Sequence, residues 1–330
     1  MHVELVVPSL LLGRSPGRRL PALEMILARA QRRREGSLPL EAWLMEAFSL
    51  PGPCPAGALT RLVHGGDAAE GCWLRADPVH LLQRREMLVL APPPAITVRE
   101  DEARAFAESI NAHFGDEFFV HADEPTRWSA RLVHGGALEA LPPLEAAGRN
   151  VNAVLPGGDA KRWHALANEL QMLLHAHPAN AAREARRERP VNSLWLWGAG
   201  KLPAFPASRW QTVWADDPLA RGIGRAAGAR DEPLARHVPE WLGRLPADGR
   251  HLALLDALRA PQAFDDTAEW TKEIARLEDE WFAPLLGALR EGRIDMLTLH
   301  VPDGADRTSH ELVPGDLRRF WKRPKPIETL

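Results

Sequence analysis

The chain has 330 residues, of which 45% are hydrophobic and 26% are charged, so it is long enough for a substantial globular core. Its net charge is −3, which argues against nucleic-acid binding because nucleic-acid-binding domains carry a basic face. Cys54 and Cys72 match neither a zinc-ligand spacing nor a disulfide framework, which favours a reducing compartment. The apolar run Val3–Leu12 contains Glu4 and is too short to span a membrane. We therefore expect a cytoplasmic protein that contacts neither membranes nor nucleic acid.

The first half of the chain alternates short strands with amphipathic helices. Val3–Val7 predicts the first strand, and apolar residues at helical spacing predict the helices Leu20–Ala30 and Leu38–Phe48. The basic run Arg32–Arg34 between these helices indicates a solvated helix end. The further elements predicted before residue 150 are the strands Cys72–Leu82, Phe118–Val120 and Trp128–Val133 and the helix Glu100–His113.

The stretch Arg189–Pro203 (RPVNSLWLWGAGKLP) organises the second half of the chain. A short apolar run bounded by Pro and Gly predicts a strand buried on both faces, as in the centre of a parallel sheet. A Gly-rich turn at the carboxyl end of such a strand is where α/β folds place their ligands. The elements predicted around it are the helices Ala160–Ala176 and Glu269–Glu291 and the strands Gln211–Ala215, His251–Leu258 and Ile294–Val301, the last of which closes the sheet. This alternation predicts a doubly wound α/β fold.

Two motifs in this half fail as cofactor sites on geometric grounds. The sequence Gly198–Lys201 looks like the end of a phosphate loop, but Leu202 stands where Ser or Thr would hold magnesium. His175 and His177 are two residues apart on a predicted helix, so their side chains diverge and cannot share a metal. Basic residues beside turns and strand ends are better candidates, because such side chains bind phosphate or carboxylate. They are Arg75, Arg127, Arg183 and Lys201, with Asp77 close by.

Eight stretches of the chain share their order with one known family. They are CWLRADPVHL, the helix from Glu100, PTRWSARLV, LPPLEAAGRNV, NELQMLLHAHPAN, RPVNSLWLWGAGKLP, DDPLARGIGRAAGA and TKEIARLEDEWFAPLL. From about residue 70 onward the chain resembles the archaeal-type cofactor-independent phosphoglycerate mutases, and most of all the bacterial RpfE-type regulatory proteins. The resemblance implies an alkaline-phosphatase-like fold, a doubly wound sheet with helices on both faces and a smaller α+β insertion. We expect the core at residues 1–83 and 151–330 and the insertion, a cap over the substrate, at 84–150.

The chain departs from these mutases where their chemistry takes place. The resemblance implies two divalent metals held by Asp and His, and a Ser nucleophile. Here the first strand ends in Val7–Ser9 instead of Asp-Gly, and Ala260–Phe264 replaces an Asp-x-x-Gly-His stretch. The Asp-His pair after the last core strand falls on Leu299–His300 and keeps only the His. Because two metals activate the nucleophile and neutralise the phosphate charge, we expect no metal cofactor and no phosphoryl transfer of the usual kind.

The resulting hypothesis is a regulatory or metabolite-binding pseudoenzyme. Its partner is expected to be a small anionic or phosphorylated metabolite, or an unidentified protein. Arg75, Arg127 and Lys201 are the candidate anion-binding residues. By resemblance, Arg75 and Arg127 fall on arginines that contact the substrate phosphate in related mutases.

Two alternatives stay open. One is an active 2,3-bisphosphoglycerate-independent phosphoglycerate mutase, or a related phosphatase, with a rearranged two-metal site. Its catalytic candidates are Ser37, which lies about where the nucleophile belongs, and His300 and His310, with Asp303 or Asp306. The other is a structural protein-interaction module with a tryptophan-rich interface.

Overall fold

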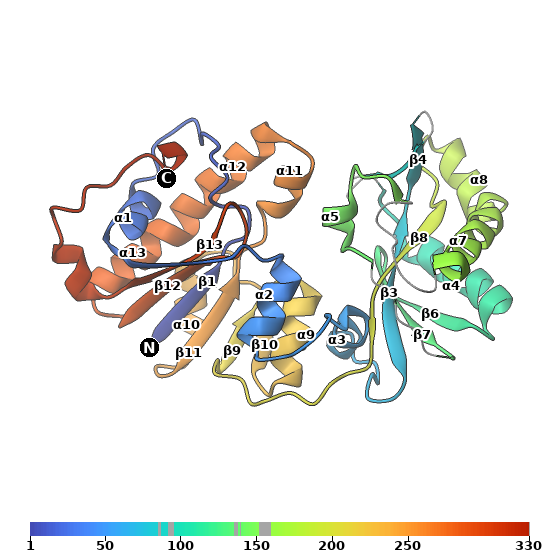
Figure 1. Cartoon of the computed structure of the whole chain (residues 1–330), viewed down its shortest axis with the longest axis horizontal. Coiled ribbons are helices and arrows are strands. Elements are labelled where there is room, and N and C mark those ends of the chain that lie inside the picture. The colour runs from blue at the N-terminus through green and yellow to red at the C-terminus, as the bar shows by residue number, and fades with distance from the viewer. Residues whose placement is uncertain (85–86, 92–95, 135–137, 139, 152–159, 330) are drawn as a thin grey trace. The chain divides into compact units, whose positions relative to one another are not determined.

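The computed structural model describes residues 1–84, 87–91, 96–134, 138, 140–151 and 160–329. These residues form two compact units, each with its own sheet (Figure 1). We call Met1–Pro51 with Phe205–Leu330 the core unit, and Gly52–Ala204 the inserted unit. The sequence predicts the insertion at 84–150, whereas the inserted unit is larger at both ends. The difference arises because Cys72–Val79 and Ser193–Gly200, both assigned to the core, pair with each other.

The core unit is built on a seven-stranded sheet in the order β10-β9-β11-β1-β12-β13-β2. The strands from β10 to β12 are parallel, and β13 and β2 are added antiparallel. The strands are β1 (His2–Val6), β2 (Gln31–Glu35), β9 (Thr212–Trp214), β10 (Arg230–Glu232), β11 (Arg250–Leu254), β12 (Met296–Val301) and β13 (Arg307–Leu312). Ile294–Val301 therefore does not close the sheet as predicted, because two polar strands follow it.

Helices cover both faces of this sheet. On one face, Val3, Leu5 and Val7 enter an apolar core with α1, α10, α12 and α13. On the other face, α9 packs on β9, and Trp43 of α2 contacts His300 with ring centroids 5.2 Å apart. The helices are α1 (Pro21–Arg29), α2 (Leu40–Ala47), α9 (Pro218–Ala226), α10 (Val238–Arg244), α11 (Arg259–Ala263), α12 (Thr267–Leu277) and α13 (Ala283–Arg290), with the short turns Glu278–Phe282, Pro314–Arg318 and Ile327–Thr329. The predicted α/β class, with helices on both faces, is confirmed.

The long helix predicted in the second half of the chain is confirmed, whereas the structure predicted for the basic run Arg32–Arg34 is wrong. The long helix predicted at Glu269–Glu291 is observed as α12 and α13, joined by a single π-turn. Glu278 in that turn accepts hydrogen bonds from the backbone N–H groups of Ala22 and Leu23, at 2.7 and 3.0 Å, and so caps α1. The basic run Arg32–Arg34 is not a helix end but lies in β2, an edge strand exposed along its whole length.

The inserted unit contains a four-stranded antiparallel sheet in the order β6-β7-β3-β8 and a separate hairpin. Helices α4 and α7 pack on one face of the sheet, and α3 packs on the other. Gly57 of α3 lies so close to the backbone of Leu74 that a Cβ would come within 2.3 Å of it. The elements are α3 (Ala56–Val63), β3 (Cys72–Val79), β4 (Leu81–Arg84), β5 (Met87–Leu90), α4 (Glu100–Phe114), β6 (Phe118–Glu124), β7 (Arg127–Leu132), α5 (Pro143–Ala146), α7 (Ala160–His175), α8 (Pro178–Ala185) and β8 (Ser193–Gly200). None of the described helices of either unit combines the length and hydropathy needed to cross a bilayer.

The prediction that Ser193–Gly200 is a central strand of the parallel sheet is wrong. Among the described strands, β8 is an edge strand of the inserted unit and pairs antiparallel with β3 alone. Its residues are apolar because both of its faces are covered. Leu194 and Leu196 join the core under α7, while the indole N–H groups of Trp195 and Trp197 donate to Leu141 O and to Asp77 on the opposite face. An apolar run indicates that a segment is buried, but it does not indicate how many strands flank that segment in the sheet.

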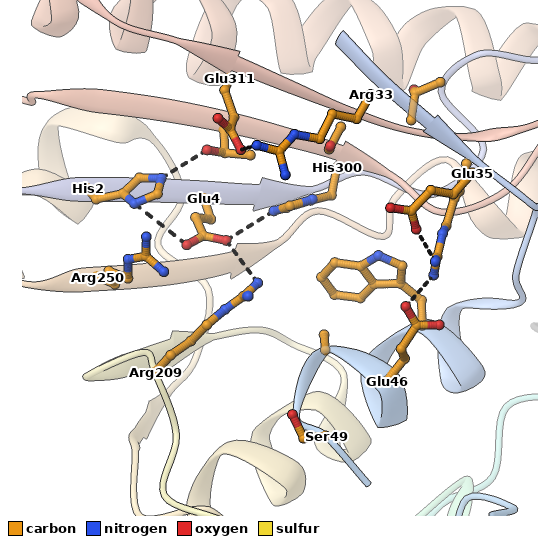
Figure 2. A pocket seen from close by; sticks show the side chains of 16 residues that line it. His2, Glu4, Arg33, Glu35, Glu46, Ser49, Arg209, Arg250, His300 and Glu311 are labelled. Atoms are coloured by element: carbon orange, nitrogen blue, oxygen red, sulfur yellow. Dashed lines mark hydrogen bonds and ion pairs between the residues drawn. The ribbon is translucent and has the colours of Figure 1, made fainter. Parts of the chain in front are cut away.

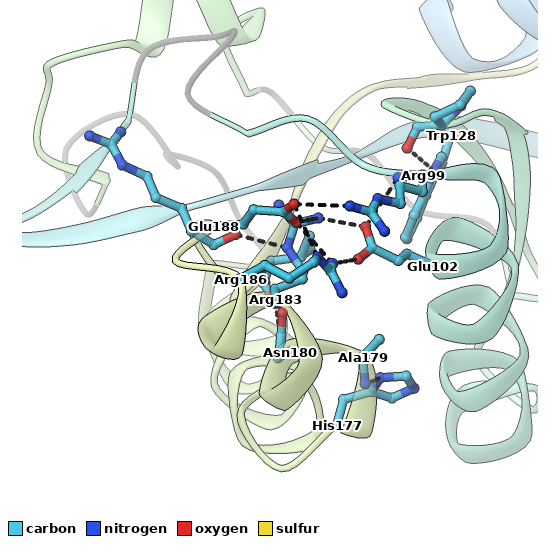
Figure 3. Close-up of polar contacts among 12 residues, drawn as sticks. Arg99, Glu102, Trp128, His177, Ala179, Asn180, Arg183, Arg186 and Glu188 are labelled. Atoms are coloured by element: carbon cyan, nitrogen blue, oxygen red, sulfur yellow. Dashed lines mark hydrogen bonds and ion pairs between the residues drawn. The ribbon is translucent and has the colours of Figure 1, made fainter.

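Arg183, a predicted anion ligand, serves instead in a buried ion network (Figure 3). Its side chain is 1% exposed and donates to Glu102 at 2.6 Å and to the carbonyl of Arg189 at 2.8 Å. Arg186 also donates to Glu102, and Glu188 lies 3.7 Å from Arg183. The network joins α8 to the first turn of α4, so it holds the helical layer of the inserted unit together.

Replacing Glu102 with Ala should destabilise the inserted unit by about 3–5 kcal/mol, because it leaves the buried Arg183 guanidinium without its carboxylate. Urea unfolding monitored by tryptophan fluorescence measures the loss. Glu188→Ala is the control, since Glu188 is more exposed and solvent screens its charge, and it should cost clearly less. Equal losses for the two variants would show that the buried pair does not hold α8 in place.

Candidate functional site

A carboxylate is buried in the middle of the central strand of the core unit. The alternation of β1 directs Val3 and Leu5 to the apolar core and Glu4 to the other face, where Glu4 is 2% exposed. The imidazole Nε2 of His300, on the neighbouring β12, donates to Glu4 at 3.0 Å. Arg209 lies 3.5 Å from the same carboxylate. This face of the sheet is therefore polar where an apolar layer is usual.

The neighbours of Glu4 keep it ionised. Burial alone would raise its pKa, but the hydrogen bond from His300 and the charges of His300, Arg209 and His2 outweigh burial, so the pKa of Glu4 is lowered. His2 lies on the same face, with Nδ1 3.8 Å from Glu4 and Nε2 2.9 Å from the hydroxyl of Thr298. Burial, followed by the charge of Arg250, lowers the pKa of His2 although Glu4 opposes the shift. A negative charge surrounded by nitrogen donors thus forms the floor of the site.

A polar pocket of about 370 Å³ opens above Glu4 (Figure 2). The strands β1, β12, β13 and β2 form its floor, and α2 contributes a wall that includes Trp43. Arg209, which precedes β9, and Arg250, the first residue of β11, lie at one end. Glu35 of β2 and Glu46 of α2 lie at the other end. The size is within the range of small-molecule sites, and the lining indicates a hydrophilic ligand.

The arginines of the pocket differ in how their charge is balanced. Arg307 pairs with Glu35 and, at 2.8 Å, with Glu46. Arg33 lies 3.8 Å from Glu311. Arg209 shares Glu4 with the histidines and stacks over Trp210, with its guanidinium carbon 4.1 Å from the ring centroid. Arg250 has no ion-pair partner within the part of the chain that the structure describes. The Arg250 end is therefore the part of the pocket that can accept an anion.

The carboxyl edge of the parallel strands, where ligands of α/β folds usually bind, carries carboxylates instead. Asp303, after β12, accepts hydrogen bonds from the backbone N–H of Ser9, at 2.7 and 2.9 Å, and from its hydroxyl at 3.0 Å. Burial and then the neighbouring Asp217 raise the pKa of Asp256, after β11, to about 6. Over the described residues, no group of three or more His, Cys, Asp or Glu side chains is arranged to hold a metal ion. These residues do not fit the two-metal centre that the resemblance implies.

The three predicted catalytic residues do not meet. His300 lines the pocket, whereas Ser37 is exposed beyond the end of β2 and does not line it. The register pairs His310 with Leu299 and Ser309 with His300, so His310 and His300 point to opposite faces of the sheet. His310 is 2% exposed and hydrogen-bonds to Thr308 at 3.1 Å. Of the two alternative acids, Asp303 holds Ser9 and Asp306 lies 4.0 Å from Arg34.

The predicted anion-binding arginines share one face of the inserted unit's sheet. Arg75 pairs across the strands with Ser129, two residues from Arg127, so alternation places both arginines on the α3 face. Arg75 is 5% exposed and donates to Asp77, and Arg127 lies 3.4 Å from Glu124. Lys201 is exposed just after β8. An anion at Arg75 would have to compete with Asp77, and the anion-binding role of all three residues stays a prediction.

Sequence reasoning missed the residues that form the pocket. The usable signal was Glu4, the one charged residue in an otherwise apolar central strand. A buried carboxylate requires cationic or donor neighbours, and these come from strands that only the fold brings together. Arg209 precedes β9 and Arg250 begins β11, and both lie in segments whose composition is ordinary for the surface of this arginine-rich chain.

Comparison with known proteins gives the following matches. No protein-family profile matches the chain. A segment of 162 residues is 31% identical to a probable 2,3-bisphosphoglycerate-independent phosphoglycerate mutase of Geobacter sulfurreducens, over 47% of this chain and 41% of that protein. A segment of 140 residues is 29% identical to a 2,3-bisphosphoglycerate-independent phosphoglycerate mutase of Methanosarcina barkeri, over 40% and 35%. The chain is similar to cofactor-independent phosphoglycerate mutases. The matched segments span less than half the length of these curated relatives.

A solved structure shares the fold of this mutase-like chain. It is the PH0037 protein from Pyrococcus horikoshii, with a TM-score of 0.58 and 10% identity over 94% of this chain and 87% of that one. At this identity the likeness concerns the fold alone. The predicted similarity to the mutases is thus confirmed by sequence, and the closer resemblance to RpfE-type regulatory proteins stays a prediction.

Replacing His310 with Leu should make the unfolding free energy less dependent on pH between about 6.5 and 4. Burial, with the charges of Arg32, His300 and Arg34, lowers the pKa of His310 to about 4. Between the two pKa values the unfolded chain binds a proton that the folded chain does not, so stability falls as the pH is lowered. Over this pH range, the titration of His310 lowers the unfolding free energy by at most about 3 kcal/mol.

Urea unfolding at several pH values tests this prediction, and His134→Leu is the control because His134 is exposed. If His310→Leu and His134→Leu show the same pH dependence, His310 is not buried in its neutral form.

Proposed function

We propose that this mutase-like chain binds a small metabolite through an anionic group, a phosphate or a carboxylate, in the polar pocket of the core unit. The observation that carries the proposal is the guanidinium of Arg250, which lines the pocket without an ion-pair partner in the described ranges. Arg209 lies at the same end and is oriented by its stacking on Trp210. A planar guanidinium can bind a phosphate or carboxylate through two parallel hydrogen bonds.

The charge at this end of the pocket supports an anionic group. Arg209 and Arg250 carry two positive charges against the single negative charge of Glu4, which leaves one positive charge for a ligand. His2 and His300 add donors beside them. An anion here would sit over a buried, hydrogen-bonded floor, at the end of the pocket that both arginines line.

We also propose that phosphoryl transfer through two metals has been lost, which makes the chain a pseudoenzyme. The exit of the first strand supports this, since Asp303 is engaged by Ser9 where the mutases place a metal ligand. Ser37, His300 and His310 do not converge, which gives the rearranged active site little support. A protein partner that binds only the metabolite-bound form of the chain would give it a regulatory role in the cytoplasm.

Isothermal titration calorimetry with inorganic phosphate and with 3-phosphoglycerate tests the proposal. The unaltered chain should bind at least one of them, and Arg250→Ala should weaken binding about tenfold, because it removes a charge-assisted hydrogen bond at a partly exposed site. Arg127→Ala is the matched control in the inserted unit and should leave the affinity unchanged.

Three outcomes would contradict the proposal. Absence of binding to either anion removes it altogether. Binding that is lost in Arg127→Ala and kept in Arg250→Ala moves the site to the arginines predicted from the sequence. Mutase activity with added manganese that Ser37→Ala abolishes would instead establish the active-enzyme alternative.

A further inference from the structure

The pocket has a negative end opposite Arg250. Glu35 and Glu46 share the single charge of Arg307, so this end carries one excess negative charge. The hydrogen bond from Arg307 lowers the pKa of Glu46, which keeps its carboxylate ionised. Figure 2 shows His300 between this end and Arg250. The pocket therefore has a positive pole and a negative pole, and its two charges cancel overall.

The two poles are far apart. Arg250 lies on β11 and Glu35 on β2, and three strands separate them in the sheet. Four strand steps of about 4.8 Å separate them across the sheet. Along the strands, Arg250 is level with Met296, whereas Glu35 is level with Pro302. The two offsets together place their backbones roughly 27 Å apart. Both side chains point into the pocket (Figure 2). An extended Arg and an extended Glu together shorten the gap by roughly 10 Å or more, so a ligand that reaches both poles needs charges roughly 15 Å apart, the span of about four extended residues. Single amino acids and three-carbon phosphates are too short.

The floor between the poles suits an extended polar chain. Thr298, Ser309 and Glu311 line the pocket along β12 and β13 and offer hydroxyl and carboxylate groups to N–H donors. Trp43 lies on the side of α2 and offers a flat apolar surface. A peptide group carries one N–H donor and one carbonyl acceptor. A peptide can therefore hydrogen-bond to the polar side chains of the floor and pack its apolar edges against Trp43.

We infer that the ligand is an elongated zwitterion of the size of a free tetrapeptide, with its carboxylate at Arg250 and its ammonium group at Glu35 and Glu46. This inference rests on the proposed anion site and adds the cationic group and the length. A simple anion would leave the negative pole unused. The carboxyl-terminal segment of a longer protein would have no ammonium group at the right distance. Both poles together therefore select a free, short chain.

Calorimetry with tetraglycine and N-acetyl-tetraglycine tests the inference, because acetylation removes only the ammonium charge. Tetraglycine should bind about tenfold more tightly than the acetylated form. Glu46→Gln should abolish this difference and leave the affinity for the acetylated form unchanged. Glu291→Gln is the matched control, since Glu291 is also an exposed glutamate paired with an arginine, at 2.8 Å, and it should preserve the difference.

The outcomes separate the two proposals. Equal affinities for the two peptides, with phosphate binding that still depends on Arg250, would overturn the zwitterion and keep the anion site. A preference for tetraglycine that survives Glu46→Gln would also overturn it. If neither phosphate nor 3-phosphoglycerate binds, the proposed function itself fails.

Discussion

The buried carboxylate of Glu4 is the constraint on which the core unit's site depends. A charge at this position in a central strand cannot be left without partners, since an unpaired buried carboxylate is strongly unfavourable. The neighbouring strands satisfy it with His300 and His2, and Arg209 approaches from the segment before β9. These groups replace the apolar side chains that α2 would otherwise pack against. One face of the sheet therefore holds a polar pocket, and the other face holds the main apolar core.

The polar pocket does not lie at the edge of the sheet where ligands of α/β folds usually bind. The chain is similar in sequence to cofactor-independent phosphoglycerate mutases, and the PH0037 protein shares its fold. At the carboxyl edge, Ser9 and Asp303 bind each other, and burial, followed by the charge of Asp217, raises the pKa of Asp256. The polar pocket lies over the middle of the strands instead. The residues suited to binding a ligand are thus not those expected to transfer a phosphoryl group.

The sequence predicts those elements whose periodicity reflects their burial. The helices α1, α2 and α4 and the strands β1, β7 and β11 follow from apolar spacing. Two failures have physical reasons. The strands β2 and β13 are largely polar, because β2 is an exposed edge strand and β13 contributes to the pocket, so no apolar pattern marks them. The strand β8 is apolar because tryptophans and leucines cover its two faces, which hides its edge position. The pocket could not be predicted, since its residues come from seven separate segments that meet only in the fold.

The most direct test of the pocket is the pKa of His2, measured by NMR titration of its imidazole protons with and without inorganic phosphate. His2 lies beside Arg250 in the sheet register, and the charge of Arg250 helps to lower the pKa of His2. An anion bound at Arg250 offsets that charge and stabilises the imidazolium, so we predict that phosphate raises the pKa of His2. If calorimetry shows that phosphate binds while the pKa of His2 stays unchanged, the anion is bound elsewhere and the pocket is not the ligand site.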